Sequence, residues 1–123
     1  MVRAEWKKMY FCGGIKEYSI MQPVSLNQSQ IIQYLSANKH NISRKYHLKK
    51  IGIFGSYARN EQTPKSDLDL LVEFEEHTPE LAEKKEFLRK EIQSVFHIHV
   101  DICREKYIKP VFRQLILSDV IYV

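Results

Sequence analysis

The sequence predicts one small α/β (or α+β) domain, in which helices flank a small mixed sheet. Its 123 residues suit a single domain, and 44% hydrophobic residues are enough for a core. Apolar spacing gives the order helix, strand, helical turn, strand, helix, strand, helix. The connection after the first strand is short for a parallel crossover, so we expect hairpin-like or mixed pairing.

Residues 1–24 are expected to form a peripheral extension, and residues 25–123 the domain itself. The extension has no clear periodicity and contains Gly13-Gly14. It is either a partner-binding arm or an artefact of start-codon choice, because Met21 follows closely.

The first helix is predicted to begin at Ser25. Ser25-x-x-Gln28 has the form of a capping box, in which two side chains satisfy each other's backbone donors. The apolar stripe continues to about Asn38, and a second short helix is expected over Ser43–His47.

Three strands follow from short apolar or alternating runs, and the tail over 121–123 is a candidate fourth. The three are Lys50–Phe54, Leu68–Phe74 and Ile98–Ile102. The connection between the first two contains a helical turn, Ser56–Asn60, and a loop, Gln62–Ser66.

Two helices are predicted in the second half of the chain. Thr78 is a candidate N-cap with Pro79 at the first helical position, and this helix runs to about Phe96. Pro110 opens the last helix, whose inward side is expected to carry Phe112, Leu115 and Ile116.

Composition limits the partners and the location of the protein. The net charge of +4 favours an anionic ligand, but basic residues do not interleave with aromatic ones, so no nucleic-acid surface is expected. No apolar run approaches the ~20 residues that cross a bilayer, so no membrane association is expected. Cys12 and Cys103 form no CxxC pair, which favours a cytoplasmic protein with reduced thiols.

The stretch over 54–74, FGSYARNEQTPKSDLDLLVEF, carries the candidate chemistry. Asp67 and Asp69 are two residues apart on a strand, so they project from one face. Asp101 lies on the polar face of the third strand. If the second and third strands are neighbours, the three carboxylates form a cluster that could hold two divalent metals such as magnesium.

The other end of the stretch is a candidate phosphate site. Gly55 would let the backbone approach an anion, and Ser56 would offer an amide and a hydroxyl at the start of a helical turn. Arg59, one turn on, could add a forked donor. No GxxxxGK sequence is present, so this is not a P-loop.

Each feature alone also has an ordinary interpretation, and only their agreement in spacing and face favours a site. His97 and His99 are expected to share a face with Asp101. They could bind a transition metal, although a solvated strand face is the favoured interpretation. Tyr57 either stacks on a base or packs in the core.

With these residues the chain resembles the nucleotidyltransferases of the DNA-polymerase-beta superfamily. Their motif is Gly-Ser, about ten residues, then Asp-x-Asp, which here is Gly55-Ser56, ten residues and Asp67-Leu68-Asp69. With the later VDIC and IKPVFRQLILSDVIYV, residues 26–123 resemble the minimal nucleotidyltransferases more narrowly.

The resemblance implies a compact polymerase-beta-like fold with a mixed sheet. It assigns Asp67, Asp69 and Asp101 as ligands of two Mg²⁺ ions, with Asp101 also a candidate general base. Gly55 and Ser56 would hold the triphosphate of ATP. Arg59 lies where the family often has a basic residue.

The resemblance also implies a role as an antitoxin. Minimal members transfer AMP from ATP to a tyrosine of a HEPN-family ribonuclease toxin, which silences it. Two alternatives stay open: nucleotidyl transfer to a small molecule, as in aminoglycoside-modifying relatives, and neutralisation by binding alone with a vestigial site.

Overall fold

The computed structural model describes residues 26–123. The expected extension over 1–24, Ser25 and Cys12 lie outside these residues. The elements, in chain order, are α2 (Gln28–Tyr46), β1 (Leu48–Phe54), α3 (Gly55–Ala58), β2 (Leu68–Phe74), α4 (Leu81–Phe96), β3 (Val100–Arg104), the 3₁₀ helix η2 (Glu105–Tyr107), α5 (Pro110–Asp119) and β4 (Ile121–Tyr122). This confirms the predicted order and the short strand in the tail.

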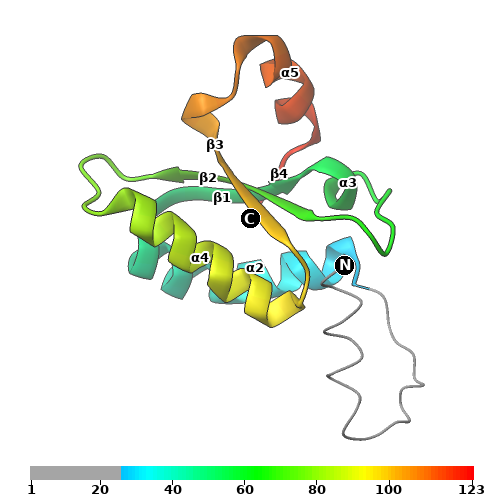
Figure 1. The fold of residues 1–123 in the computed structure, drawn as a ribbon, viewed down its shortest axis with the longest axis horizontal. Coiled ribbons are helices and arrows are strands. Elements are labelled where there is room, and N and C mark those ends of the chain that lie inside the picture. Colours follow the sequence, from blue (N-terminus) through cyan, green and yellow to red (C-terminus); the bar gives the residue numbers. More distant parts are fainter. Residues whose placement is uncertain (1–25) are drawn as a thin grey trace, which may run out of the picture.

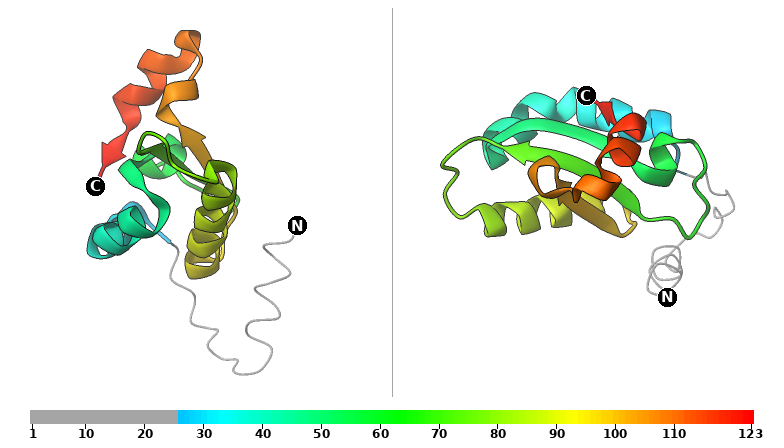
Figure 2. Two further views of the ribbon diagram at one scale, coloured as in Figure 1. Left: turned by 90° about the vertical axis from the view of Figure 1, so that its left-hand side faces the viewer. Right: turned by 90° about the horizontal axis from the view of Figure 1, so that it is seen from above.

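The sheet has the strand order β3-β2-β1-β4 and is mixed, as predicted. β1 pairs antiparallel with β2 and β4, whereas β2 pairs parallel with β3. Helices α2 and α4 lie against one face of the sheet, and α5 stands over the other (Figure 1). Figure 2 shows the same three layers from the side and from above.

The core lies between the sheet and the pair α2 and α4. Both helices and the three longer strands supply side chains that are less than 2% exposed: Ile31, Leu35, Ile51, Ile53, Leu68, Leu70, Val72, Leu88, Ile92 and Val100. Alternation along β2 therefore sends Leu68, Leu70 and Val72 toward the helices. Asp69 and Glu73 fall on the opposite face.

Helix α2 begins two residues later than the predicted capping box. Asn27 is the N-cap: its Oδ1 accepts from the Gln30 amide at 2.9 Å, and its own amide donates to Gln30 Oε1 at 2.9 Å. The capping box therefore forms two residues later than predicted, between Asn27 and Gln30. The Gln28 side chain takes no part in it and contacts α3 instead.

The predicted break after Asn38 was wrong, because α2 continues without interruption to Tyr46. Ile42 and Tyr46 resume the buried stripe after the polar run over 38–41. His47 ends the helix in the left-handed conformation, with φ 59°. β1 then starts at Leu48, whose side chain is buried, rather than at Lys50.

The start of α4 also differs from the prediction. Glu80, in the left-handed conformation, is the N-cap and makes no side-chain cap. The Thr78 hydroxyl instead donates to the Glu75 carbonyl within the preceding turn. β3 begins at Val100, two residues after the expected Ile98.

Helix α5 has the expected start at Pro110 but not the expected burial. Phe112 is 50% exposed and Leu115 is 66% exposed, so the prediction that both face inward was wrong. Ile116 is half-buried. The helix contacts β1 and α3 but stands above the sheet, which leaves its other side in solvent (Figure 1). Within residues 26–123, no helix combines the length and apolar character that a bilayer crossing requires.

The contrast in burial between two leucines predicts the cost of truncating each one. Leu70→Ala, in the middle of β2 with no exposed surface, is expected to lower the free energy of unfolding by about 2–5 kcal/mol. Leu115→Ala, on the outer side of α5, should change it by less than about 0.5 kcal/mol. Urea denaturation of both variants checks this, and similar losses would contradict the assignment of the core.

Candidate active site

The Gly-Ser turn sits where β1 passes directly into the short helix α3. Gln28 at the start of α2 holds this helix: its Nε2 donates to the carbonyls of Tyr57 at 3.3 Å and Ala58 at 2.8 Å. The Tyr57 side chain is only 4% exposed, so it packs in the core. Sequence reasoning missed Gln28, because no local pattern signals a contact between residues about thirty positions apart.

Gly55 is glycine for two structural reasons. Its φ is +77°, which L side chains rarely adopt. A Cβ at this position would also lie 2.3 Å from Asp69 Oδ2. Gly55 thus lets the Asp69 carboxylate lie directly against the turn, a contact that the sequence did not reveal.

The three predicted carboxylates come together on the sheet face that carries α5. β2 and β3 are neighbours, and Asp69 lies directly opposite Asp101 in the parallel register. The carboxylate cluster, defined as Asp67, Asp69 and Asp101, therefore forms as predicted. His99 joins it: its Nδ1 lies 3.5 Å from Asp67 Oδ2 and 3.7 Å from Asp101 Oδ1.

Asp69 is the buried member of the cluster, and its surroundings disfavour its ionised form. Burial, followed by the nearby charges of Asp101 and Asp67, raises the pKa of Asp69 from 3.8 to about 6. Arg59 and His99 offset this only in part. Asp67 and Asp101 are more open, with side chains 40% and 58% exposed.

Arg59 is engaged within the chain. Its Nε donates to Glu61 Oε1 at 3.0 Å, and its Nη1 donates to Asp119 Oδ2 at 2.8 Å. The second bond joins the C-terminal end of α3 to the last residue of α5. The predicted contact of Arg59 with phosphate stays a prediction.

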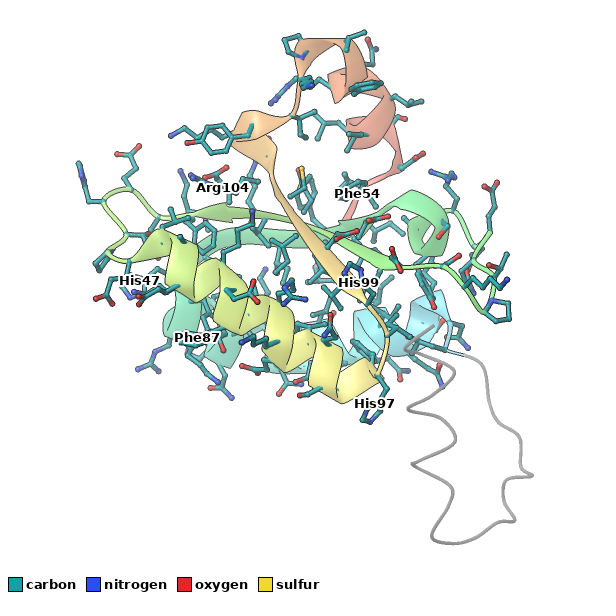
Figure 3. The ribbon with its side chains drawn as sticks, viewed as in Figure 1. His47, Phe54, Phe87, His97, His99 and Arg104 are labelled. Atoms are coloured by element: carbon teal, nitrogen blue, oxygen red, sulfur yellow. The ribbon has the colours of Figure 1, made fainter. Side chains whose placement is uncertain are left out.

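The two histidines of the His-x-His-x-Asp sequence separate. His97 is the C-cap of α4, with φ 60°, and precedes β3. The expectation that it shares a face with Asp101 was wrong, since α4 runs to Phe96 and the strand starts only at Val100. Figure 3 shows His97 at the end of α4 and His99 beside the sheet.

The donor set of the cluster fits a divalent cation. Asp67, His99 and Asp101 each offer a ligand atom, and these atoms lie within 4.8 Å of one another. This group contains His99 and not Asp69, whose role as a metal ligand stays a prediction. Carboxylate oxygens are the ligands that Mg²⁺ prefers. Burial, and after it the negative charges of Asp101 and Asp67, raise the pKa of Asp69, and a bound cation would neutralise those charges.

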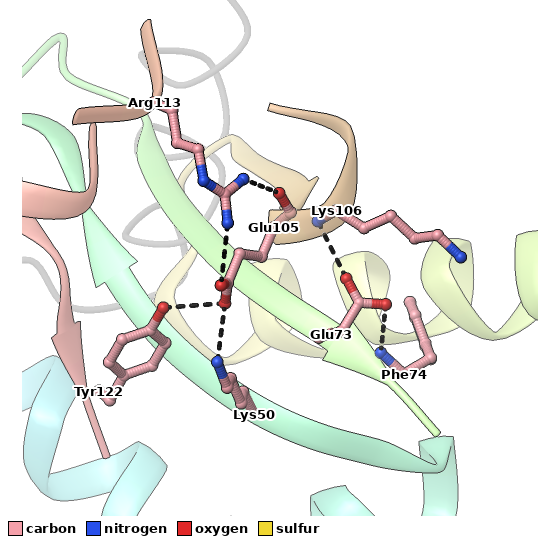
Figure 4. A network of polar contacts seen from close by, with 7 residues as sticks. All are labelled: Lys50, Glu73, Phe74, Glu105, Lys106, Arg113 and Tyr122. Atoms are coloured by element: carbon pink, nitrogen blue, oxygen red, sulfur yellow. Dashed lines mark hydrogen bonds and ion pairs between the residues drawn. The ribbon is translucent and has the colours of Figure 1, made fainter. Parts of the chain in front are cut away.

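A groove of about 490 Å³ lies at the opposite end of the strands, away from the carboxylate cluster. Two acids of its lining are paired within the chain. Glu105 bonds Lys50 and Tyr122, and lies 3.6 Å from Arg113 (Figure 4). Glu73 accepts from Arg104 and from the amides of Phe74 and Lys106. We assign the chemistry to the cluster instead, because these groove residues bind each other and tie the strands to η2 and α5.

Known proteins match both the sequence and the fold. A family model described as "Nucleotidyltransferase domain" matches residues 35–123. "Putative protein adenylyltransferase MJ0128" of Methanocaldococcus jannaschii is 45% identical over 77% of this chain and 96% of its own. "Protein adenylyltransferase MntA" of Thermococcus cleftensis is 33% identical over 80% of this chain and 97% of its own.

Two solved structures share the architecture. One, described as a "putative minimal nucleotidyltransferase", has a TM-score of 0.67 and 26% identity, and covers 80% of this chain and 98% of its own. The other, from a "toxin-antitoxin with AMP-PNP", has a TM-score of 0.56 and 23% identity, and covers 79% and 72%. The second shows a shared fold alone.

Substitution of Gly55 tests the contact between the turn and the cluster. Gly55→Ala is expected to lower the free energy of unfolding by about 1–3 kcal/mol, since it adds backbone strain and displaces the Asp69 carboxylate. ATP binding in the presence of Mg²⁺, measured by calorimetry, should weaken as well. Wild-type binding by this variant would contradict the argument.

Gly52→Ala is the matched control. Its Cβ would meet the Ile121 carbonyl oxygen at 2.7 Å, so it should loosen β4 and also lower stability. Because the atoms nearest to this Cβ belong to Ile121 and Tyr122 and not to the carboxylates, the folded variant should bind ATP and Mg²⁺ like wild type.

The raised pKa of Asp69 predicts a pH-dependent cost in the metal-free protein. Between pH of about 4 and about 6 the folded state keeps a proton that the unfolded state releases, so the contribution of Asp69 to stability falls as pH rises. Asp69→Asn should therefore raise the free energy of unfolding by about 1–2 kcal/mol at pH of about 8 with EDTA, and hardly change it at about pH 4. The exposed Glu76→Gln should change little at either pH, and an equal effect of Asp69→Asn at both would contradict the prediction.

Proposed function

This chain belongs to the nucleotidyltransferase domain family, and from that premise we propose that it transfers AMP from ATP to a hydroxyl of a partner protein. The observation that carries the proposal is the convergence of Asp67, Asp69 and Asp101 beside the turn at Gly55. Two relatives named as protein adenylyltransferases, which the chain matches over nearly their whole length, support AMP and a protein acceptor.

The proposed reaction is an in-line displacement at phosphorus. The acceptor hydroxyl oxygen forms a bond to the α-phosphorus of ATP as the bond to the bridging β-phosphate oxygen breaks, and pyrophosphate leaves with the electron pair. The hydroxyl proton passes to a base. Asp101 is proposed for this role because its carboxylate is 58% exposed and so is open to an incoming acceptor.

The remaining residues would position the nucleotide. Asp67, Asp69 and Asp101 would hold two Mg²⁺ ions, which when bound neutralise charge on the phosphates. Gly55 and Ser56 open α3, and the first amides of a helix have no partner within it, so they and the Ser56 hydroxyl can donate to the triphosphate. Arg59 is close enough to Asp69 to act on its charge, which supports a place at the edge of the site.

The proposed acceptor is a tyrosine of a HEPN-family toxin, and its modification would neutralise the toxin. A structure that shares this fold is described as a toxin–antitoxin complex with an ATP analogue. The half-exposed carboxylate cluster is compatible with a protein acceptor, because a macromolecule can approach it from solvent.

The test is transfer of label from ATP marked at the α-phosphate to the purified HEPN protein of the neighbouring gene. With Mg²⁺, we expect AMP on a tyrosine, located by mass spectrometry. Asp67→Asn combined with Asp69→Asn should reduce transfer by more than about a hundredfold, since a catalytic metal contributes several kcal/mol. Glu76→Gln, an exposed acid at the far end of β2, should leave transfer unchanged.

Two other outcomes would contradict the proposal. Label on an aminoglycoside and none on the protein would show a small-molecule transferase. A doubly substituted variant that still neutralises the toxin in cells would show that binding alone is sufficient.

A further inference from the structure

His99 places an imidazole nitrogen among the carboxylates. Its Nδ1 lies 3.5 Å from Asp67 Oδ2 and 3.7 Å from Asp101 Oδ1. Both distances exceed the ~2.7–3.2 Å of an N–H···O hydrogen bond. They are close to the separation of two ligands on one ion, since atoms each bound at ~2.1 Å to a common metal lie roughly 3.0–3.5 Å apart.

The backbone fixes this arrangement. The Leu68 amide donates to the His99 carbonyl at 2.9 Å, one step before the parallel ladder begins at Leu68 and Val100. His99 is two residues from Asp101 along the chain, so both side chains reach the same side of the sheet. The His99 side chain is 50% exposed and is therefore accessible to an ion from solvent.

The chemistry of a nitrogen donor differs from that of the carboxylates around it. Mg²⁺ takes oxygen ligands, whereas imidazole suits later first-row ions such as Co²⁺, Ni²⁺ and Zn²⁺. We propose that His99 is a metal ligand of this cluster and gives the site a preference for such transition ions over Mg²⁺. The inference deepens the proposed function, on which it rests, because it concerns the metal of the same site.

One other role for His99 makes the opposite prediction. As a cationic partner of the two carboxylates, His99 would compete with any metal. Its removal would then strengthen the binding of Mg²⁺ and Co²⁺ alike, whereas removal of a ligand weakens Co²⁺ binding selectively.

The test is titration of the full chain with Co²⁺ or Mg²⁺ alone, without nucleotide, at neutral pH. Calorimetry gives the affinities, and the visible absorption of Co²⁺ reports its ligands. His99→Ala should weaken Co²⁺ binding by roughly ten- to a hundredfold and alter its spectrum, while Mg²⁺ binding changes by less than about twofold. His97→Asn, a matched histidine at a left-handed position that Asn tolerates, should leave both affinities unchanged.

Equal weakening of both ions by His99→Ala would overturn the proposal, as would strengthening of both or no change. Thermal unfolding in EDTA verifies that the variant folds. His99→Gln, which keeps a polar side chain, should weaken Co²⁺ binding to the same extent as His99→Ala. Asp67→Asn should weaken the binding of both ions. Failure of Mg²⁺-dependent AMP transfer would refute the proposed function but would not alter the measured preference between metals.

Discussion

The register of strand β2 is the constraint on which the rest of the structure depends. β2 is paired on both sides, antiparallel to β1 and parallel to β3, and these pairings put Phe54, Asp69 and Asp101 in one row across the sheet. Side chains alternate between the two faces of a strand, so a slip of one residue would turn the carboxylates into the core and Leu68 and Leu70 into solvent. The hydrophobic core therefore specifies the geometry of the site, and α2 and α4 hold that register from the face that the site does not use.

The carboxylate cluster opposes the stability that this core supplies. Asp69 lies against Gly55 and close to two other acids, and its pKa of about 6 records the cost of ionising it there. A chain selected only for stability would not retain this arrangement, because an amide or apolar side chain would remove the repulsion. The short α3 is held by the Gln28 amide, the buried Tyr57 ring and the ion pair between Arg59 and Asp119. Such multiple support is what a site needs when its own charges do not stabilise it.

Local patterns in the sequence predicted the elements that burial governs. β2 was predicted to the residue, because Leu68–Phe74 is a continuous apolar run broken only by the two acids that face away. The alternation of side chains along a strand, together with the assumption that the second and third strands are neighbours, predicted the carboxylate cluster. The errors arose where distant contacts decide the outcome. Ile42 extends α2 past its polar run, and the outer side of α5 stays exposed. The bond of Arg59 to Asp119, sixty residues away, likewise has no local signal in the sequence. The contact of Gly55 with Asp69 and the position of His99 depend on strand pairing, which no local pattern contains.

The acids at the two ends of the same sheet face have pKa values that shift in opposite directions: the pKa of Glu73 and Glu105 is lowered, whereas that of Asp69 is raised. Burial alone would raise the pKa of Glu73 and of Glu105, but Arg104 and backbone amides lower the first, and Lys50 and Tyr122 lower the second. Those acids are satisfied by groups of the chain itself, and the groove they line is a tie between β2, η2 and α5. The pKa of Asp69 is raised instead, because burial and the charges of Asp101 and Asp67 outweigh the effect of Arg59 and His99. Within residues 26–123, the positive groups near Asp69 offset the rise in its pKa only in part, so under the proposed function a divalent cation brought with a nucleoside triphosphate would supply the missing charge.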